Sequence, residues 1–372
     1  MKVLQLGKFF PPVRGGIETA TWKLAEGLNA RGVAADVLVA HTEARTVHER
    51  AAAGYAVVRV ASIGQFHSVS LAPRLPFELA AIAARYDLIH VHMPDPLAAL
   101  ALWWARPRGR IVLHWHSDVV RQRLMMPLYA PLQRWLLARA DAVIATSPPY
   151  AEASATLAPW QGKVHVIPLG IADPRERLEP ARVQTLRAAH AGRRLVAALG
   201  RMTYYKGFDV LIDAAALLPP DVRVLIGGSG AGFAACEEQV RQRGLEDRVF
   251  LLGDIDDAEV PALMAAAELF CLPSTERAEA FGVAMLEGMA MGRPVVCAHI
   301  EGSGVPWLNR HGETGLVVPP GDAAAMAAAI ADLLADPARA RQLGAAARAR
   351  YEADFRAEQM VDATLALYRS LG

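Results

Sequence analysis

The stretch Glu279-Ala-Phe-Gly-Val-Ala-Met-Leu-Glu287 places two carboxylates eight residues apart, where a predicted strand passes into a predicted helix. The apolar run at 269–273 is typical of a buried strand that enters a turn. Apolar side chains then recur at helical spacing, at 283, 286, 289 and 290, and the Gly-Arg-Pro sequence at 292–294 ends the helix. We therefore expect Glu279 in the loop at the carboxyl end of a strand and Glu287 about two turns into the helix. In open α/β sheets, ligands bind at that edge.

The chemistry of this stretch points to a phosphate and a sugar. The first amides of the helix, near Phe281, Gly282 and Val283, carry partial positive charge that favours a phosphate. Glu279 can hydrogen-bond sugar hydroxyls, and Glu287 can take the two hydroxyls of a ribose. The alternative is a loop charge and a solvated helix position. We favour ligand binding, because Glu287 lies in a helix that is apolar nearly all round, where an unpaired charge is costly.

Composition narrows the class of protein. A chain of 372 residues is too long for one ordinary core and suits two domains. With 53% hydrophobic and 21% charged residues it is not disordered, and a net charge of +1 argues against nucleic acid as the main partner. Cys271 and Cys297 lie in apolar strands, which suits a reducing cytoplasm. Since neither a signal peptide nor an apolar run of membrane-spanning length is seen, we expect a cytoplasmic protein.

Strands and helices alternate through both halves of the chain. Strands are expected at 3–7, 36–40, 57–60, 87–92, 110–116, 141–146 and 164–168, and then at 195–200, 222–227, 249–253, 269–273, 294–298 and 315–318. The last three helices are expected at 323–335, 338–350 and 357–371. Continuous apolar strands between helices predict parallel sheets covered on both faces. We therefore expect an α/β protein with two Rossmann-like, doubly wound parallel-sheet domains that face each other across a cleft, with their boundary in the polar stretch 173–190.

Two loops can bind phosphate. Gly15 and Gly16 stand at a helix start, where glycine lets the backbone approach a phosphate, and Glu18 is either a ligand contact or a first-turn helix charge. Arg201 and Lys206 lie between the first strand of the second half and a helix expected at 208–218. Their cations can converge with the helix amides on a diphosphate. An ordinary basic loop is the alternative, but this loop faces the same crevice as the opening stretch, so we favour diphosphate binding.

Four histidines lie on two predicted strands of the first half of the chain. His116 ends a strand on the crevice side, where a neutral imidazole can hydrogen-bond a sugar hydroxyl or pass a proton, and a purely structural role is the alternative. His114 and His116 alternate on one strand face, and His90 and His92 do so on another. This pattern could hold a metal, but no cysteine or third clustered carboxylate supports one, so we predict no metal.

A basic stretch lies between residues 106 and 139. It holds seven arginines, at 106, 108, 110, 121, 123, 134 and 139, against one acid, Asp118. Apolar and aromatic side chains interleave with them. Such a stretch can lie on an anionic membrane, and an amphipathic core helix with a solvated face is the equal alternative.

Taken together, these motifs resemble glycosyltransferase family 4, the retaining enzymes of the GT-B fold. The resemblance runs almost end to end: G-G-x-E at Gly15–Glu18, His-Ser at 116–117, G-R-x-x-x-x-K-G at 200–207 and E-x7-E from Glu279 to Glu287. It implies that no metal or cofactor is needed. It also implies that the final helix, 355–372, crosses back to the first domain. The domains are then 1–172 with 355–372, which would bind the acceptor, and 173–354, which would bind the nucleotide-sugar.

The resemblance also implies roles for single residues. Arg201 and Lys206 would hold the donor diphosphate and stabilise the leaving group, and Glu279 would bind the donor sugar near its reacting carbon. His116 would contact the sugar. The amides of Phe281 and Gly282, with Val283 beside them, would contact the sugar or the phosphate. Glu287 would bind the ribose, and Gly16 would contact the phosphate. Gly15 and Glu18 would lie on the acceptor side.

Finer motifs resemble one subgroup, the bacterial enzymes that build O-antigen or exopolysaccharide repeat units. They are His116-Ser-Asp118, Tyr204-Tyr-Lys206 and Gly302-Ser-Gly-Val-Pro-Trp307. The resemblance implies transfer of a hexose, with GDP-mannose favoured, to a saccharide or polyprenyl-linked saccharide, at the cytoplasmic face of the membrane if the basic stretch binds it. Transfer from a UDP-sugar, a nucleotide-sugar epimerase, a phosphorylase and a non-catalytic nucleotide-sugar-binding protein stay open.

Overall fold

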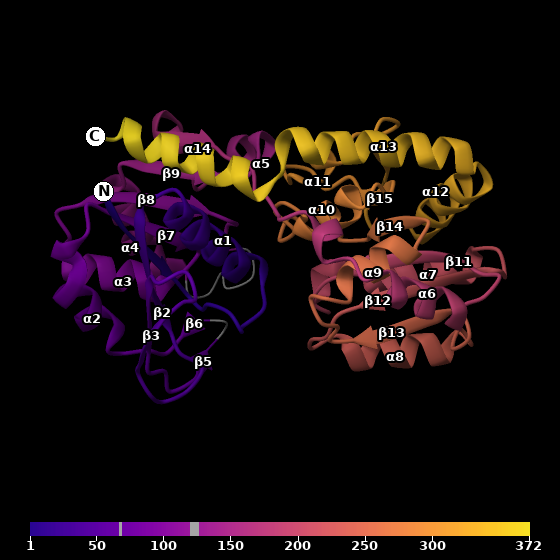
Figure 1. The fold of residues 1–372 in the computed structure, drawn as a ribbon, viewed down its shortest axis with the longest axis horizontal. Coiled ribbons are helices and arrows are strands. Elements are labelled where there is room, and N and C mark those ends of the chain that lie inside the picture. The colour runs from indigo at the N-terminus through magenta and orange to yellow at the C-terminus, as the bar shows by residue number, and fades with distance from the viewer. Residues whose placement is uncertain (67–68, 120–125) are drawn as a thin grey trace. The chain divides into compact units, whose positions relative to one another are not determined.

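The protein is described by a computed structural model that covers residues 1–66, 69–119 and 126–372, without the side chain of Phe66. It divides into two compact units (Figure 1). Unit 1 comprises Met1–Leu169 with Ala357–Gly372, and unit 2 comprises Gly170–Arg356. The sequence analysis had placed these boundaries at 172/173 and 354/355.

Unit 1 is built on an eight-stranded sheet of order β10-β9-β8-β7-β1-β2-β4-β3. The strands are β1 (Lys2–Gly7), β2 (Ala34–Ala40), β3 (Val47–Arg50), β4 (Ala56–Val60), β7 (Leu88–Met93), β8 (Arg110–Trp115), β9 (Ala142–Ala145) and β10 (Val164–Val166). Its central strands are buried along nearly their whole length because helices cover both faces. The strand order reverses between β1 and β7, so the loops that leave these two strands diverge at the carboxyl edge of the sheet.

Two features of unit 1 differ from the prediction of purely parallel strands. β3 pairs antiparallel with β4, and a two-residue ladder joins β5 (Gln65–Phe66) to β6 (Val69–Ser70). β3 reads Val-His-Glu-Arg and is largely exposed at the sheet edge. Charged side chains are typical of an edge strand. Because β3 has no apolar run, the hydrophobic pattern did not predict it.

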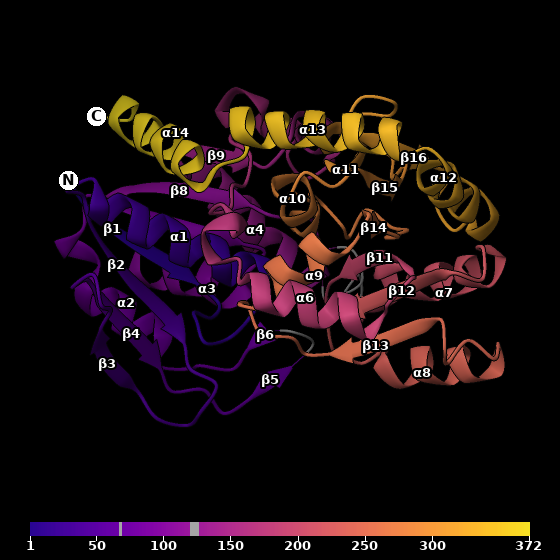
Figure 2. The same ribbon diagram turned by 45° about the vertical axis from the view of Figure 1, so that its right-hand side comes forward.

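Helices of unit 1 begin at recognisable signals. They are α1 (Gly16–Ala30), α2 (Leu75–Ile82), α3 (Pro96–Ala105), α4 (Met126–Arg139), α5 (Pro148–Ala153) and α14 (Ala357–Ser370). The Asp95 carboxylate caps α3 by accepting from the amides of Leu97 and Ala98. The C-terminal helix α14 lies alongside α1 (Figure 2). Their approach is close, since a Cβ on Gly27 would lie 2.4 Å from the Val361 side chain.

Unit 2 has a six-stranded, fully parallel sheet of order β13-β12-β11-β14-β15-β16. The strands are β11 (Arg194–Leu199), β12 (Val222–Gly227), β13 (Val249–Gly253), β14 (Leu269–Leu272), β15 (Val295–Ala298) and β16 (Gly315–Val318). Numbered from β11, this is the 3-2-1-4-5-6 order of a Rossmann sheet, and it reverses between β11 and β14. The helices are α6 (Pro180–Ala189), α7 (Phe208–Leu217), α8 (Phe233–Gln242), α9 (Val260–Ala266), α10 (Val283–Ala290), α11 (Val305–Leu308), α12 (Ala323–Ala335) and α13 (Pro337–Asp354).

One detail of α10 corrects the sequence analysis. The helix begins at Val283 with Gly282 as its N-cap, in the left-handed region at φ 87°. Phe281 therefore precedes the helix, and its buried side chain belongs to the core. Glu287 is the fifth residue of α10 and lies just over one turn from its start, rather than two. The error arose because the strand ends at Leu272 and a ten-residue loop, 273–282, precedes the helix.

Candidate active site

The strand order of the unit 2 sheet reverses between β11 and β14. The predicted diphosphate loop follows one of these strands, and the loop that carries Glu279 follows the other. Residues 200–207 follow β11, and residues 273–282 follow β14. The Thr275 amide donates to the Tyr205 carbonyl at 2.9 Å and ties the loops together. Gly207 has φ 65°, and a Cβ there would lie 2.1 Å from the Pro273 carbonyl oxygen. Only glycine allows this approach, which turns the chain from Lys206 directly into α7.

Lys206 and Glu279 form a buried ion pair at this point. The Lys206 ammonium lies 2.5 Å from Glu279 Oε2, and only 11% and 9% of the two side chains are exposed. The Ser274 hydroxyl donates to the same carboxylate oxygen at 2.8 Å, and the Ser303 hydroxyl donates to the Glu279 carbonyl. Removal of either charge would leave the other buried and unpaired, which costs about 3–5 kcal/mol. The pair is therefore held in one geometry by its neighbours.

Arg201 completes the basic loop. Its side chain is exposed, and within the described part of the chain it makes no hydrogen bond or ion pair. The Lys206 ammonium has three N–H donors, of which the pair with Glu279 uses one. With respect to the described residues, the loop therefore offers a free guanidinium and two free ammonium donors, which is the chemistry that a diphosphate requires.

Glu287 is a carboxylate in a desolvated position. Its Oε2 is shut off from solvent and has no hydrogen-bond partner among the described residues. Burial raises the pKa of Glu287 to about 7. The nearby charge of Asp257 raises this pKa further, and the charge of Arg177 lowers it. A buried acceptor without a partner is costly, so a ligand that donates two hydroxyls would relieve it.

In unit 1, Gly15, Gly16 and Glu18 lie at the start of α1. Gly15 is the N-cap of the helix, and the Glu18 carboxylate folds back over it: a Cβ on Gly15 would lie 2.1 Å from Glu18 Oε2. Any larger residue at position 15 would displace this carboxylate. Gly15 thus adjoins the Glu18 carboxylate, a contact that the G-G-x-E spacing alone does not reveal.

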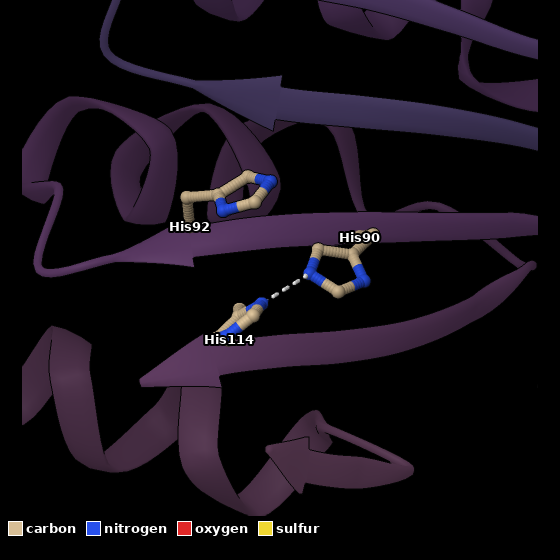
Figure 3. A group of neighbouring side chains, drawn as sticks. All are labelled: His90, His92 and His114. Atoms are coloured by element: carbon tan, nitrogen blue, oxygen red, sulfur yellow. Dashed lines mark hydrogen bonds between the residues drawn. The ribbon is translucent and has the colours of Figure 1, made fainter. Parts of the chain in front are cut away.

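His116 directly follows β8 at the carboxyl edge of the unit 1 sheet, and it belongs to a buried cluster of four histidines. His90 and His92 lie on β7, and His114 lies beside them on β8 (Figure 3). The rings of His114 and His116 stack at 4.2 Å between centroids. One nitrogen from each of His90, His92 and His114 lies within 4.8 Å of the other two.

Hydrogen bonds within the cluster use several of the ring nitrogens. His90 Nε2 lies 3.3 Å from His114 Nδ1, and His92 Nδ1 lies 3.0 Å from His116 Nε2. Gln5 on β1 and Tyr368 on α14 join the network, although neither was predicted from the sequence. Gln5 is the one polar side chain in residues 3–7 of β1, and that is the signal that marked it.

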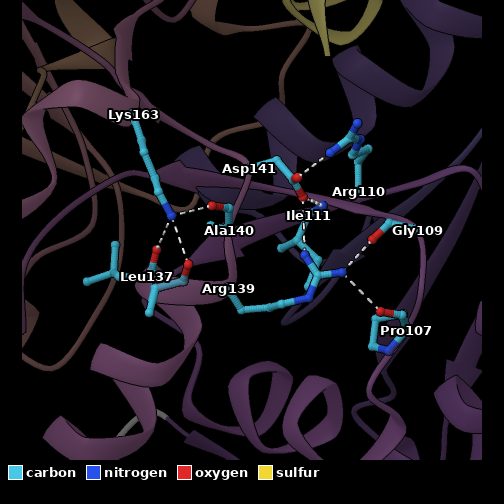
Figure 4. A network of polar contacts seen from close by, with 10 residues as sticks. Pro107, Gly109, Arg110, Ile111, Leu137, Arg139, Ala140, Asp141 and Lys163 are labelled. Carbon is cyan, nitrogen blue, oxygen red and sulfur yellow. Dashed lines mark hydrogen bonds and ion pairs between the residues drawn. The ribbon is translucent and has the colours of Figure 1, made fainter. Parts of the chain in front are cut away.

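The arginine-rich stretch is partly structural. Arg110 and Arg139 both pair with Asp141, and Arg139 also donates to the carbonyls of Pro107 and Gly109 (Figure 4). Arg121 and Arg123 lie outside the described residues. The exposed Arg106 and Arg108 stand at the end of α3. No described helix has the length and apolarity to cross a membrane.

Comparisons with known proteins identify the family of the chain. The family model "Glycosyltransferase Family 4" matches residues 14–175, and "Glycosyl transferases group 1" matches 187–350. The chain is 34% identical to O-antigen chain mannosyltransferase C of Escherichia coli, over 100% of this chain and 99% of that protein. It is also 34% identical to D-rhamnosyltransferase WbpZ of Pseudomonas aeruginosa, over 96% and 93% of the two chains.

Solved structures show the same fold over the whole chain. The Anabaena protein Alr3699/HepE in complex with UDP superposes with a TM-score of 0.80 at 26% identity and full coverage of both chains. Sucrose-phosphate synthase from Thermosynechococcus elongatus reaches a TM-score of 0.84 at 27% identity, over 100% and 99% of the chains. With relatives of this identity along its full length, the chain belongs to glycosyltransferase family 4, has the GT-B fold and is a glycosyltransferase.

Proposed function

We propose that the enzyme transfers a hexose, with GDP-mannose as the favoured donor, to a saccharide or polyprenyl-linked saccharide in the synthesis of a cell-surface polysaccharide. The transfer would retain the anomeric configuration and need no metal. The observation that carries this proposal is the Lys206–Glu279 pair at the strand-order reversal of unit 2, with Arg201 beside it. Full-length likeness to a mannosyltransferase of O-antigen chains supports the choice of donor and acceptor.

Charge development on the departing diphosphate is the step that these residues would ease. Fixed cations aimed at an oxygen that gains charge act most strongly in a partly dry site, and they cost no reorganisation during the reaction. The Lys206 ammonium is held by Glu279, so it would meet the leaving oxygen in a set position. Arg201 can take two phosphate oxygens with its planar fork. Glu279 would hold the sugar next to the bond that breaks.

One observation favours a second donor class. The Anabaena structure similar to this chain contains UDP, and further structures of the same protein contain UDP with glucose or UDP-glucose. A UDP-sugar is therefore the alternative donor. An epimerase of the same fold is also distinguishable, because it would change the donor sugar without any acceptor.

A thermal-shift panel with GDP-mannose, UDP-glucose and ADP-glucose tests the donor. A ligand present at 100 times its Kd stabilises the folded state by about 2.7 kcal/mol. In a unit of this size that raises Tm by roughly 5–10 °C. We expect the largest shift with GDP-mannose. A larger shift with UDP-glucose would favour the alternative, and no shift with any of the three would refute nucleotide-sugar binding.

Glu287 supplies the matched variant for this panel. Glu287→Gln keeps the shape but gives the ribose hydroxyls a weaker acceptor, so the shift should shrink by more than half. Glu237→Gln is the control, since Glu237 is an exposed acid on α8 of the same unit. Equal shifts in wild type and Glu287→Gln would remove Glu287 from the donor site.

We also propose that the enzyme touches a membrane peripherally through an aromatic patch, defined as Phe77, Leu100, Trp103 and Trp104. These side chains are 60%, 43%, 41% and 54% exposed. Leu100, Trp103 and Trp104 recur at helical spacing on α3, and the Trp104 ring packs edge-on against Phe77 of α2 at 5.4 Å. Exposed Arg106 lies over the Trp103 ring at 5.8 Å, so cationic charge adjoins the patch. Tryptophan next to arginine is typical of membrane-surface contacts.

Sedimentation with phospholipid vesicles checks this contact. The double variant W103S/W104S should bind vesicles rich in phosphatidylglycerol about tenfold or more weakly than wild type, because two large apolar side chains no longer enter the interface. Leu217→Ser removes an apolar side chain of similar exposure, 62%, from unit 2 and should leave binding unchanged. Equal binding of wild type and W103S/W104S would place any membrane contact elsewhere.

A further inference from the structure

The buried histidine cluster of unit 1 is organised by one amide, that of Gln5. Gln5 is 0% exposed and lies on β1, between β2 and β7. Its Oε1 faces His92 Nε2 at 3.1 Å, and its Nε2 donates to the Tyr368 hydroxyl at 3.4 Å. An amide has one accepting and one donating end, so these two contacts differ in kind.

The first arm of the network runs from Gln5 to His116. Gln5 Oε1 can only accept, so His92 must carry its proton on Nε2. His92 Nδ1 then has a lone pair and accepts from His116 Nε2 across 3.0 Å. His116 must therefore carry its own proton on Nε2. The position of the proton on each ring is set by the hydrogen bond that the other ring nitrogen makes.

The second arm runs through Tyr368. The Tyr368 oxygen accepts a hydrogen bond from the Gln5 amide, and the Tyr368 hydroxyl in turn donates one to His90 Nδ1, 2.5 Å away. His90 is then protonated on Nε2 and donates to His114 Nδ1 at 3.3 Å. This leaves the His114 proton on Nε2, a buried atom without a partner among the described residues. All four rings thus share one tautomer, and reversal of the Gln5 amide would convert all four together.

All four histidine rings are neutral near neutral pH. Burial lowers the pKa of His90, His92 and His116 well below the usual value, and it lowers the pKa of His114 to about 3. Each ring therefore has a single proton, and its tautomer is the only variable. The Nε2–H form is also the more populated one in free histidine, so the cost of this state is confined to the unpartnered His114 Nε2–H, about 1–3 kcal/mol.

The open end of the network is His116 Nδ1. This atom forms no hydrogen bond within the described ranges, and it is not one of the buried nitrogens that lack a partner, so part of its surface stays accessible. His116 is the first residue after β8, at the carboxyl edge of the sheet where ligands of such folds bind.

We propose that Gln5 and His92 are positioning residues that hold His116 in its Nε2–H form, so that Nδ1 accepts a hydrogen bond from a hydroxyl of the bound sugar. A lone pair at this place selects a ligand atom that carries a proton. It repels a phosphate oxygen, which carries none. The identity of the ligand rests on the proposed function, whereas the tautomer of His116 does not.

Nuclear magnetic resonance of the full chain with 15N-labelled histidine tests the tautomer directly. Couplings from the ring carbon-bound protons distinguish Nδ1–H from Nε2–H, and the variants His92→Gln and His116→Gln assign the signals. We expect Nε2–H at His90, His92, His114 and His116 without any ligand. An Nδ1–H signal from His116, or a stoichiometric bound metal that is lost in His90→Gln, would overturn the proposal.

Variants of Gln5 test the cause. In Gln5→Met the His92 Nε2–H would lose its buried acceptor, which costs about 1–3 kcal/mol, so His92 and His116 should shift to Nδ1–H. Gln5→Glu keeps an acceptor for His92 and should keep Nε2–H on His116. Gln133→Met removes another buried glutamine of unit 1 as the matched control and should change neither ring. Unchanged His116 signals in folded Gln5→Met would refute the positioning role.

Kinetics provide the functional readout. With GDP-mannose, or whichever nucleotide-sugar stabilises the enzyme most, Gln5→Met should raise the donor KM about tenfold and change kcat less, while Gln5→Glu should restore much of the KM. An unchanged KM beside a changed tautomer would refute the sugar contact but leave the network intact. Since the spectra need no substrate, failure of this proposal is distinguishable from failure of the proposed function.

Discussion

Lys206→Met is expected to lower kcat of sugar transfer by about 10²–10³-fold, the usual effect of losing one donor that stabilises developing oxyanion charge. Methionine keeps the length of the side chain but removes the charge. The donor KM should change less, because Arg201 remains to bind the diphosphate. Transfer from radiolabelled nucleotide-sugar to acceptor, followed under single-turnover conditions, measures the chemical step separately from product release.

A structural role for Lys206 must be separated from a catalytic one, because the buried pair with Glu279 would be broken. Lys206→Met alone should lower Tm, since it leaves a carboxylate unpaired. The double variant Lys206→Met/Glu279→Gln removes both charges and keeps the Ser274 hydroxyl as a donor to position 279. It should recover stability and not activity. Recovery of both, or near wild-type kcat in Lys206→Met, would show that Lys206 serves only the fold.

Glu279→Gln should reduce turnover by about 10²-fold or more, because a neutral amide offers no charge to an oxocarbenium-like sugar and holds the sugar hydroxyls less strongly. The amide oxygen can still accept from Ser274 and Lys206, so the loop 273–282 should keep its shape, although the unpaired Lys206 charge should lower Tm. Nucleotide binding in the thermal-shift panel should be retained. Initial rates of transfer, with hydrolysis of the donor recorded in parallel, give the comparison.

Glu276 provides the control for this variant. Glu276 is exposed and lies three residues earlier in the same loop. Its backbone carbonyl accepts a hydrogen bond from the Glu279 amide at 2.9 Å, and its side chain takes no part in this contact. Glu276→Gln should therefore keep wild-type activity. If Glu276→Gln and Glu279→Gln lost activity equally, the charge of the whole loop rather than the carboxylate of Glu279 would be responsible.

The repeating strand–helix pattern was readable from local sequence. Strands such as β12, β13 and β16 have the predicted bounds, because buried strands of parallel sheets are continuous apolar runs between turn residues. Elsewhere the ends shifted by one or two residues, as at β8, which stops at Trp115. The exposed edge strand β3 was missed, since its register depends on pairing with β4 and not on apolar side chains.

The candidate site was only partly visible. The E-x7-E spacing marked Glu279 and Glu287, and the basic loop marked Arg201 and Lys206. The direct contact between Lys206 and Glu279 could not be predicted, because it depends on β11 and β14 being neighbours in the sheet. Gln5 and Tyr368 escaped notice, although their side chains meet across 363 positions of sequence.

By itself, the sequence determined two tandem α/β sheets, their glycine-marked loops and the residue types that suit a nucleotide-sugar, because these depend on periodicity and turn chemistry within a few residues. The tertiary structure alone decided the Lys206–Glu279 pair, the unpartnered oxygen of Glu287 and the contacts among the four buried histidines. Strand order brings distant loops to one edge, and burial removes the water that would otherwise satisfy each polar group separately. Charge and protonation of these residues are therefore properties of the packed sheet in each unit.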